Sequence, residues 1–192
     1  MLDRKDATSI KKELDTYSSS KIELMKASRD VVKSSKILIY SIHRGDMTSA
    51  KKNLGDINAL RKRIDKLAST PKLKNYSPYE NALQEYVEAV AYHIFVLEGR
   101  IPTSKELCVD AETYLMGLSD LTGELMRKAV NDAVAEDYEG VKKIRDTVDE
   151  IYGLVVGLDL DGGEARRKTD QIKWNLTKVE GIVYDAKIRG NI

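Results

Sequence analysis

The chain has 192 residues, of which 42% are hydrophobic and 33% are charged, and its formal net charge is +1. These values exclude a disordered chain and predict one domain, residues 1–192, with a sizeable core. No apolar run approaches the ~20 residues of a transmembrane helix, and the N-terminus lacks the apolar core of a signal peptide. The single cysteine excludes an intramolecular disulfide. We therefore expect no membrane association and a cytoplasmic location.

Charge is distributed unevenly along the chain. Residues 1–79 carry 18 Lys and Arg against 9 Asp and Glu, residues 80–165 carry 7 against 19, and residues 166–192 carry 7 against 3. Basic ends around an acidic middle suit a polyanionic ligand held near acidic chemistry. Uneven charge is also common in helical proteins, so this feature alone leaves both interpretations open.

The first predicted helix spans residues 5–43, where apolar residues recur at a spacing close to 3.5. At 1.5 Å per residue it would be roughly 55–60 Å long, so part of it can extend into a partner subunit. Gly45 is expected to end it, and Asp46 to cap a second helix at about 47–69. After a loop, Ser77 is predicted to cap the next helix, which ends at Glu98.

Residues 81–97 of that third helix have only two charges, Glu85 and Glu88. Leu83, Val87 and Val90 form part of one apolar face, and the glutamates lie on the other side. That other side is also mostly apolar, which is typical of a buried helix. Two carboxylates on a buried helix require cations, hydrogen-bond donors or a metal ion as partners.

A second helix with the same character is predicted from Asp110 to about residue 134, after a short helical turn that starts at Thr103. Its central part, residues 113–126, carries only Asp120 and Glu124. Gly117 and Gly123, within the same part, would let another backbone or a ligand approach these acids. Amphipathic helices at 136–156 and 164–189 complete an all-α bundle.

If the acid faces of the two helices meet, three or four carboxylates converge, and they cannot all stay ionised without a cation. A cluster of oxygen ligands favours Mg²⁺ or Mn²⁺, and such an ion can activate water against a phosphodiester. The alternative is that each acid pairs with a lysine or arginine or faces solvent. A di-iron site is disfavoured, because neither His43 nor His93 stands at Glu-x-x-His spacing. We interpret His43 as a helix-capping cation and His93 as a core residue.

Candidate contacts for a nucleic acid lie on three predicted helices. They are Arg29, Lys33 and Lys36 on the first helix, Arg61 in the basic run of the second, and Lys173 on the last. Tyr76 and Tyr79 are candidates for stacking on unpaired bases. Taken singly, such charges are usually solvated surface, and the lone Cys108 and Trp174 are most simply packing residues.

Four segments of the chain resemble the translin/TRAX family. They are KASRDVVKSSKILIYSIHRGD at 26–46, LQEYVEAVAYHIFVLEGRIPT at 83–103, YLMGLSDLTGELMRKAVNDA at 114–133 and RRKTDQIKWNLTKVEGIVYDAKIRG at 166–190. The resemblance implies an all-α bundle of roughly seven helices, with long antiparallel helices. It also implies closed oligomers, often octamers, that enclose single-stranded RNA. TRAX-type subunits are metal-dependent endoribonucleases, whereas translin subunits bind nucleic acid without the catalytic acids.

The family's catalytic, metal-binding acids match Glu85 and Glu88 in EYVE and Asp120 and Glu124 in DLTGE. Arg29 matches a basic position that the family uses for RNA contact. The resemblance therefore predicts an endoribonuclease, dependent on Mg²⁺ or Mn²⁺, that cleaves single-stranded RNA within a closed homo-oligomer such as a homo-octamer. Single-stranded DNA is a second candidate ligand. The rival hypotheses are a non-catalytic, translin-like oligomer that binds single strands, and a purely structural helical scaffold.

Overall fold

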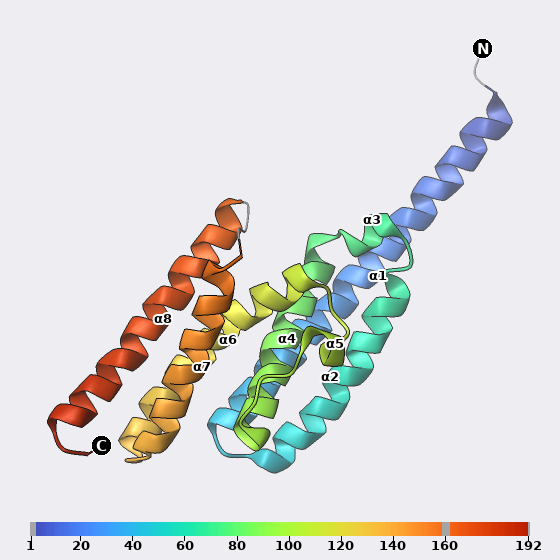
Figure 1. Cartoon of the computed structure of the whole chain (residues 1–192). Helices are drawn as coiled ribbons and strands as arrows, with labels where there is room; N and C mark the ends of the chain where they lie inside the picture. Colours follow the sequence, from blue (N-terminus) through green and yellow to red (C-terminus); the bar gives the residue numbers. More distant parts are fainter. Residues whose placement is uncertain (1–2, 159–161, 192) are drawn as a thin grey trace.

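The computed structural model describes residues 3–158 and 162–191, and within these ranges the chain forms eight α-helices and no strand (Figure 1). The long helices are α1 (Arg4–His43), α2 (Met47–Leu67), α4 (Ser77–Glu98), α6 (Ala111–Val134), α7 (Tyr138–Val156) and α8 (Gly163–Ile188). The all-α prediction is confirmed. Two connections each contain a single helical turn, α3 (Pro71–Lys74) and α5 (Ser104–Leu107). The turn at α5 was predicted, and α3 brings the number to one more than the predicted seven.

Two groups of three helices meet along α4 and α6. Helices α1, α2 and α4 pack together on one side, α6, α7 and α8 pack together on the other, and α4 contacts α6 between them (Figure 1). Their buried apolar side chains form one continuous cluster, to which Leu83, Val87 and Val90 of α4 belong. The predicted buried face of α4 is therefore confirmed, except that Leu97 is exposed in its last turn. None of the described helices is long and apolar enough to span a membrane.

The predicted helix boundaries depend on capping residues, most of which act as expected. The side chain of Asp46 accepts a hydrogen bond from the Ser49 amide at the start of α2, and Asp110 caps α6 in the same way. Gly45 follows α1 in the left-handed conformation, which glycine adopts without strain. The prediction for Ser77 is wrong, because Ser77 is already helical and Tyr76 stands at the cap position without a side-chain cap.

The N-terminal half of α1 extends beyond the rest of the bundle (Figure 1). None of residues 3–23 is buried, and burial begins at Leu24. The 40 residues of α1 correspond to about 60 Å, as predicted. Contacts in this half include the Lys72 ammonium of α3, 4.1 Å from the centre of the Tyr17 ring, and the Lys21 ammonium, 4.9 Å from the centre of the Tyr76 ring. The exposed apolar residues Ile10 and Leu14 thus stand on a helix with little else packed against it.

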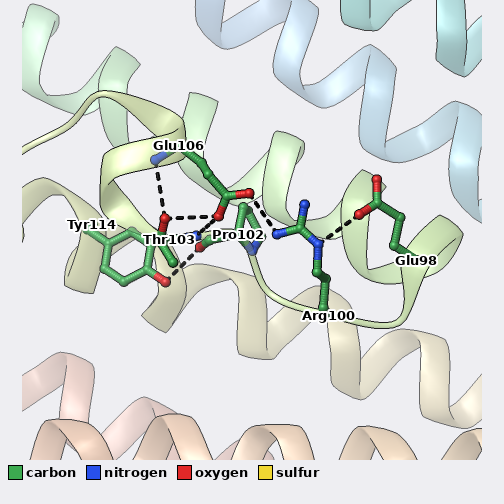
Figure 2. Close-up of polar contacts among 6 residues, drawn as sticks. All are labelled: Glu98, Arg100, Pro102, Thr103, Glu106 and Tyr114. Carbon is green, nitrogen blue, oxygen red and sulfur yellow. Dashed lines mark hydrogen bonds and ion pairs between the residues drawn. The ribbon is translucent and has the colours of Figure 1, made fainter.

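The connection between α4 and α6 is tied together by its own polar contacts (Figure 2). Arg100 pairs with Glu98, the last residue of α4, at 2.7 Å and with Glu106 of α5 at 2.9 Å. Thr103 and Glu106 form the predicted capping box. The Tyr114 hydroxyl of α6 donates to the carbonyl oxygen of Pro102 at 2.8 Å. These contacts link the end of α4 to the start of α6, the two helices that carry the acid pairs.

Candidate active site

The four acids singled out from the sequence line a single pocket of about 530 Å³. Glu85 and Glu88 reach it from α4, and Asp120 and Glu124 reach it from α6. Its other lining residues come from α1, α6 and α8; they are Lys36, Ile39, Tyr40, Gly123, Arg127 and Gln171. The fold therefore brings together the two acid pairs that the periodicity placed on separate helices.

Close packing of α4 and α6 sets the distance between the pairs. A Cβ atom added to Gly117 of α6 would lie 2.6 Å from the Cβ of Val87 and 2.9 Å from the carbonyl oxygen of Gln84, both on α4. Any larger side chain at Gly117 would force the helices apart. Gly123 has no such restriction, since its nearest contact would be the Asn175 amide nitrogen at 3.9 Å. The two glycines that the sequence suggested for close approach thus differ, and only Gly117 fixes the helix spacing.

Three of the four acids already have cationic or imidazole partners. The Lys36 ammonium lies 3.6 Å from Glu85 Oε1, and the Lys168 ammonium donates to Asp120 Oδ1. His43 Nε2 lies 2.5 Å from Glu124 Oε2. These contacts supply part of the positive charge that converging carboxylates require.

Glu88 differs from the other three, because within the described chain its carboxylate has no hydrogen bond or ion pair. Burial and, secondarily, the nearby carboxylates of Asp120, Glu85 and Glu124 raise the pKa of Glu88 to about 8. Burial also raises the pKa of Glu85, although Lys36 opposes that shift. If all four acids were ionised, the pocket would hold more negative charge than the neighbouring side chains neutralise, most of all around Glu88.

A divalent cation suits this donor set, since all four acids offer hard oxygen ligands. As the side chains stand, however, no three acidic, histidine or cysteine residues in the described ranges are grouped closely enough to hold an ion. Lys36 and Lys168 occupy the carboxylates in the way that a metal ion would. The residues therefore fit Mg²⁺ or Mn²⁺ chemically, on condition that these ammonium groups move aside.

His43 is part of the site, contrary to its interpretation as a capping cation. Its side chain is almost fully buried, with Nε2 on Glu124 and Nδ1 3.1 Å from the Tyr92 hydroxyl. Sequence spacing could not reveal this contact, because Glu124 lies 81 residues away. The sequence also offered no reason to single out Lys168 among the lysines of the last helix. Only the structure shows that it lies beside Asp120.

The candidate nucleic-acid contacts fall in different places. Arg29, Lys33 and Lys36 are exposed on one face of α1 and line a groove beside the acid pocket. Lys173 is exposed on α8 but does not line either of these cavities. Arg61 is buried; its guanidinium pairs with Asp65 and donates to the Cys108 carbonyl oxygen at 3.1 Å. These intramolecular bonds, and not a phosphate, account for Arg61.

Other residues also differ from their predicted roles. Tyr79 is buried and donates to Asp65 at 2.8 Å, so it does not present its ring for base stacking. Cys108 and Trp174 are exposed, so neither is the core packing residue that the sequence suggested. His93 is a core residue, as predicted, but it was also expected to be hydrogen-bonded, and its Nδ1 has no hydrogen-bond partner among the described residues.

Comparison with known proteins places the chain in a family. A family model described as the Translin family matches residues 20–190. Translin-associated protein X of Pongo abelii is 28% identical over an alignment of 228 positions, which covers 95% of this chain and 78% of that protein.

Two solved structures share the fold. A crystal structure of apo-NeC3PO is 31% identical, with a TM-score of 0.87, and the match covers 96% of this chain and 97% of that chain. The structure of an AfC3PO–duplex RNA complex has the same TM-score and coverage at 22% identity. The eight-helix arrangement is therefore that of these C3PO chains.

Proposed function

The chain belongs to the translin family, and from that premise we propose that it is a metal-dependent endoribonuclease that cleaves single-stranded RNA within a closed homo-oligomer. The observation that carries the proposal is the pocket in which Glu85, Glu88, Asp120 and Glu124 converge from α4 and α6. A structural scaffold has no need of four acids around one cavity, and least of all of a half-buried Glu88 without a partner.

RNA is supported as the ligand by two observations. A protein of the same fold, AfC3PO, has been solved in complex with duplex RNA. In the described part of this chain, Arg29 and Lys33 on α1 form no ion pair, and both line the groove beside the acid pocket, as phosphate contacts require. Lys173 remains a candidate for a more distant phosphate contact.

The proposed metal ligands are Glu85, Glu88, Asp120 and Glu124, and the donor set suits Mg²⁺ or Mn²⁺. When bound, such an ion activates water for hydrolysis and neutralises charge that develops on the phosphodiester. The protein's own residues prepare the site. Glu124 is held in place by His43, whose second ring nitrogen is occupied by Tyr92 and is not free as a general base. Lys36, Lys168 and Arg127 lie where they can pass from the carboxylates to the phosphates of a bound strand.

Self-association is supported by apolar surface that the monomer leaves uncovered. On α1 the exposed large residues include Ile10, Leu14 and Ile22, and on α8 they include Trp174, Tyr184 and Ile188. Large apolar side chains gathered on the outer helices are typical of protein–protein interfaces. Sedimentation analysis should therefore show a single assembly larger than a dimer. A shell that encloses an RNA strand needs more than two subunits.

Cleavage assays with labelled RNA test the catalytic proposal. The wild-type protein should cut single-stranded RNA with Mg²⁺ or Mn²⁺ and not with EDTA, leaving 5′-phosphate and 3′-hydroxyl ends. Glu88→Gln and Asp120→Asn should abolish cutting, while Glu80→Gln, an exposed glutamate on the same helix as Glu88, should not. Cleavage that survives EDTA or Glu88→Gln would show that the acids are not catalytic. Single-stranded DNA of the same sequence shows whether the site selects the sugar.

A non-catalytic, RNA-binding oligomer is the second candidate. It is favoured by the observation that Lys36 and Lys168 already occupy Glu85 and Asp120, with no metal-binding group of side chains in the described residues. That function predicts tight, salt-sensitive binding of single strands and no cutting with any divalent ion. Titration of labelled single-stranded RNA with the protein, in Mn²⁺ and in EDTA, therefore separates the two functions by measuring both binding and cutting.

A further inference from the structure

The inference concerns a groove on α1 that adjoins the acid pocket. It has a volume of about 730 Å³ and is lined by Ser28, Arg29, Val32, Lys33, Lys36, Ile37 and Tyr40 of α1 and by Pro78 and Asn81 of α4. Lys36 and Tyr40 line both cavities, so the groove and the acid pocket are adjacent. We call it the α1 groove.

The walls of the α1 groove are apolar and aromatic. Val32, Ile37, Tyr40 and Pro78 supply them, and two of these side chains are unusually open for their type. Ile37 is 43% exposed and Tyr40 is 54% exposed. Arg44 fixes the Tyr40 ring, because its guanidinium donates to the Tyr40 hydroxyl at 3.1 Å and lies 5.6 Å from the ring centre. A held aromatic ring at the mouth of an apolar groove is suited to a planar apolar ligand.

The rim of the same groove is basic. Arg29, Lys33, Lys36 and Tyr40 are spaced by four, three and four residues, which places them in one row along α1. The row is about 16 Å long and ends at the acid pocket. Arg29 and Lys33 have no ion pair in the described chain, and Lys36 has only Glu85 at 3.6 Å. This row offers positive charge to an anion that lies along the helix.

A buried hydroxyl adds a polar contact to the groove. Ser28 lines it and is 1% exposed, yet its Oγ has no hydrogen-bond partner. A serine in a helix commonly donates to the carbonyl four residues earlier, as Thr16 and Ser19 do in this same helix. The Ser28 hydroxyl thus leaves a hydrogen bond unmade beside the groove, and the exposed Asn81 amide stands at the other wall.

From these features we infer that the α1 groove is a nucleobase subsite, which takes the base of a single-stranded RNA nucleotide next to the phosphate in the acid pocket. The inference rests on the proposed function, since it requires an RNA strand to reach that pocket. Apolar walls with an aromatic ring accept the base, and the basic row accepts the phosphates on either side. Nucleic-acid grooves that bind single strands combine these same two elements.

The charge of the groove argues against other occupants. An apolar partner helix in the groove would bury Arg29, Lys33 and Lys36 without counter-charges. Cores of protein interfaces are depleted of lysine for this reason. A duplex would keep its bases stacked and paired, and so could not place one in the groove. The subsite therefore predicts preference for single strands over duplexes.

Binding measured without catalysis tests the subsite directly. The background is Glu88→Gln in EDTA, and the probes are a labelled oligouridine and an abasic ribose-phosphate strand of equal length. Adding Tyr40→Ala should weaken oligouridine binding about 5- to 100-fold and leave the abasic strand unchanged. Tyr40→Phe should restore binding, and Leu154→Ala, which truncates an exposed apolar side chain on α7, should not affect it. Lys33→Ala should weaken both strands equally and reduce the salt slope by about 1.

Photocrosslinking gives a second, independent measurement. A strand that carries 5-bromouridine should crosslink to the peptide containing Tyr40, as identified by mass spectrometry. Equal weakening of both strands by Tyr40→Ala, or no weakening of either, would overturn the subsite. A change of oligomer size by Tyr40→Ala before RNA is added would also overturn it, because the groove would then be covered by a second copy.

The two proposals fail in different ways. Base-dependent binding without cleavage under any metal would leave the subsite standing and refute the ribonuclease. Metal-dependent cleavage with binding that is indifferent to the bases would refute only the subsite.

Discussion

Gly117 on α6 packs against Val87 on α4 so closely that no side chain fits between the two helices: an added Cβ would lie 2.6 Å from the Val87 Cβ. Glu88 follows Val87, and Asp120 stands three residues after Gly117, so this contact sets how near the two acid pairs lie. The residue that brings the carboxylates together has no chemistry of its own.

Gly117→Ala should therefore destabilise the protein by about 1–3 kcal/mol, because the added methyl group must push α4 and α6 apart. The matched control is Gly123→Ala, which has room for a methyl group and should stabilise by about 0.5–1 kcal/mol through a less flexible unfolded chain. Urea unfolding measures both. Equal effects of the two substitutions would contradict the assigned contact.

Glu88 gives a pH dependence whose sign is unusual for a glutamate. Its pKa is raised from 4.5 to about 8, so between these values the folded chain keeps a proton that the unfolded chain has lost. Stability in EDTA should fall as pH rises through that range. Glu88→Gln removes this pH dependence. Its free energy of unfolding should exceed that of the wild type by on the order of 2–4 kcal/mol at pH 9, and the two should be nearly equal at pH 4.5.

Thermal unfolding across this pH range measures the difference, with Glu80→Gln as the exposed control on the same helix. A gap between Glu88→Gln and wild type that does not change with pH would mean that Glu88 is not held in its protonated form. Addition of Mn²⁺ to the wild type should restore stability at pH 9, because a cation favours the ionised carboxylate.

Lys168 competes with a metal ion for Asp120. Lys168→Ala should tighten Mn²⁺ binding about tenfold, or ~1.4 kcal/mol, since the ion no longer displaces an ammonium group. It should also lower the melting temperature in EDTA, because Asp120 loses its partner. Lys173→Ala, an exposed lysine of the same helix, should do neither. Calorimetric titration with Mn²⁺ measures the affinity, and weaker binding by Lys168→Ala would show that this lysine supports the ion.

His43 joins three helices through its two ring nitrogens. His43→Leu leaves the Tyr92 hydroxyl without a partner and Glu124 with only Arg127 at 3.9 Å, and it should cost about 1–3 kcal/mol. Tyr92→Phe should cost about 0.5–1.5 kcal/mol. The double variant should cost less than the two together, because both remove the same hydrogen bond. Strictly additive losses in urea unfolding would exclude the His43–Tyr92 bond.

Much of the fold follows from local patterns. The apolar periodicity predicted the six long helices. Asp46 and Asp110 predicted where two of them begin, and Thr103 predicted the start of the short helix α5. These predictions succeed because caps and amphipathic faces depend on residues within one or two turns. Ser77 failed as a cap because serine is tolerated equally well in the first turn, and local sequence does not distinguish the two positions.

The sequence alone determined that Glu85, Glu88, Asp120 and Glu124 lie on two largely apolar helices. Both the helical periodicity and the few charged positions within it can be read directly from the sequence. Only the tertiary structure decided that these helices meet at Gly117. It also decided that His43 binds Glu124, that Lys168 binds Asp120, and that Arg61 forms an ion pair with Asp65. Such contacts join residues that are tens of positions apart in the chain. They also decide which of several similar lysines lies beside a given acid. They depend on how whole helices pack, and packing is a property of all the side chains together.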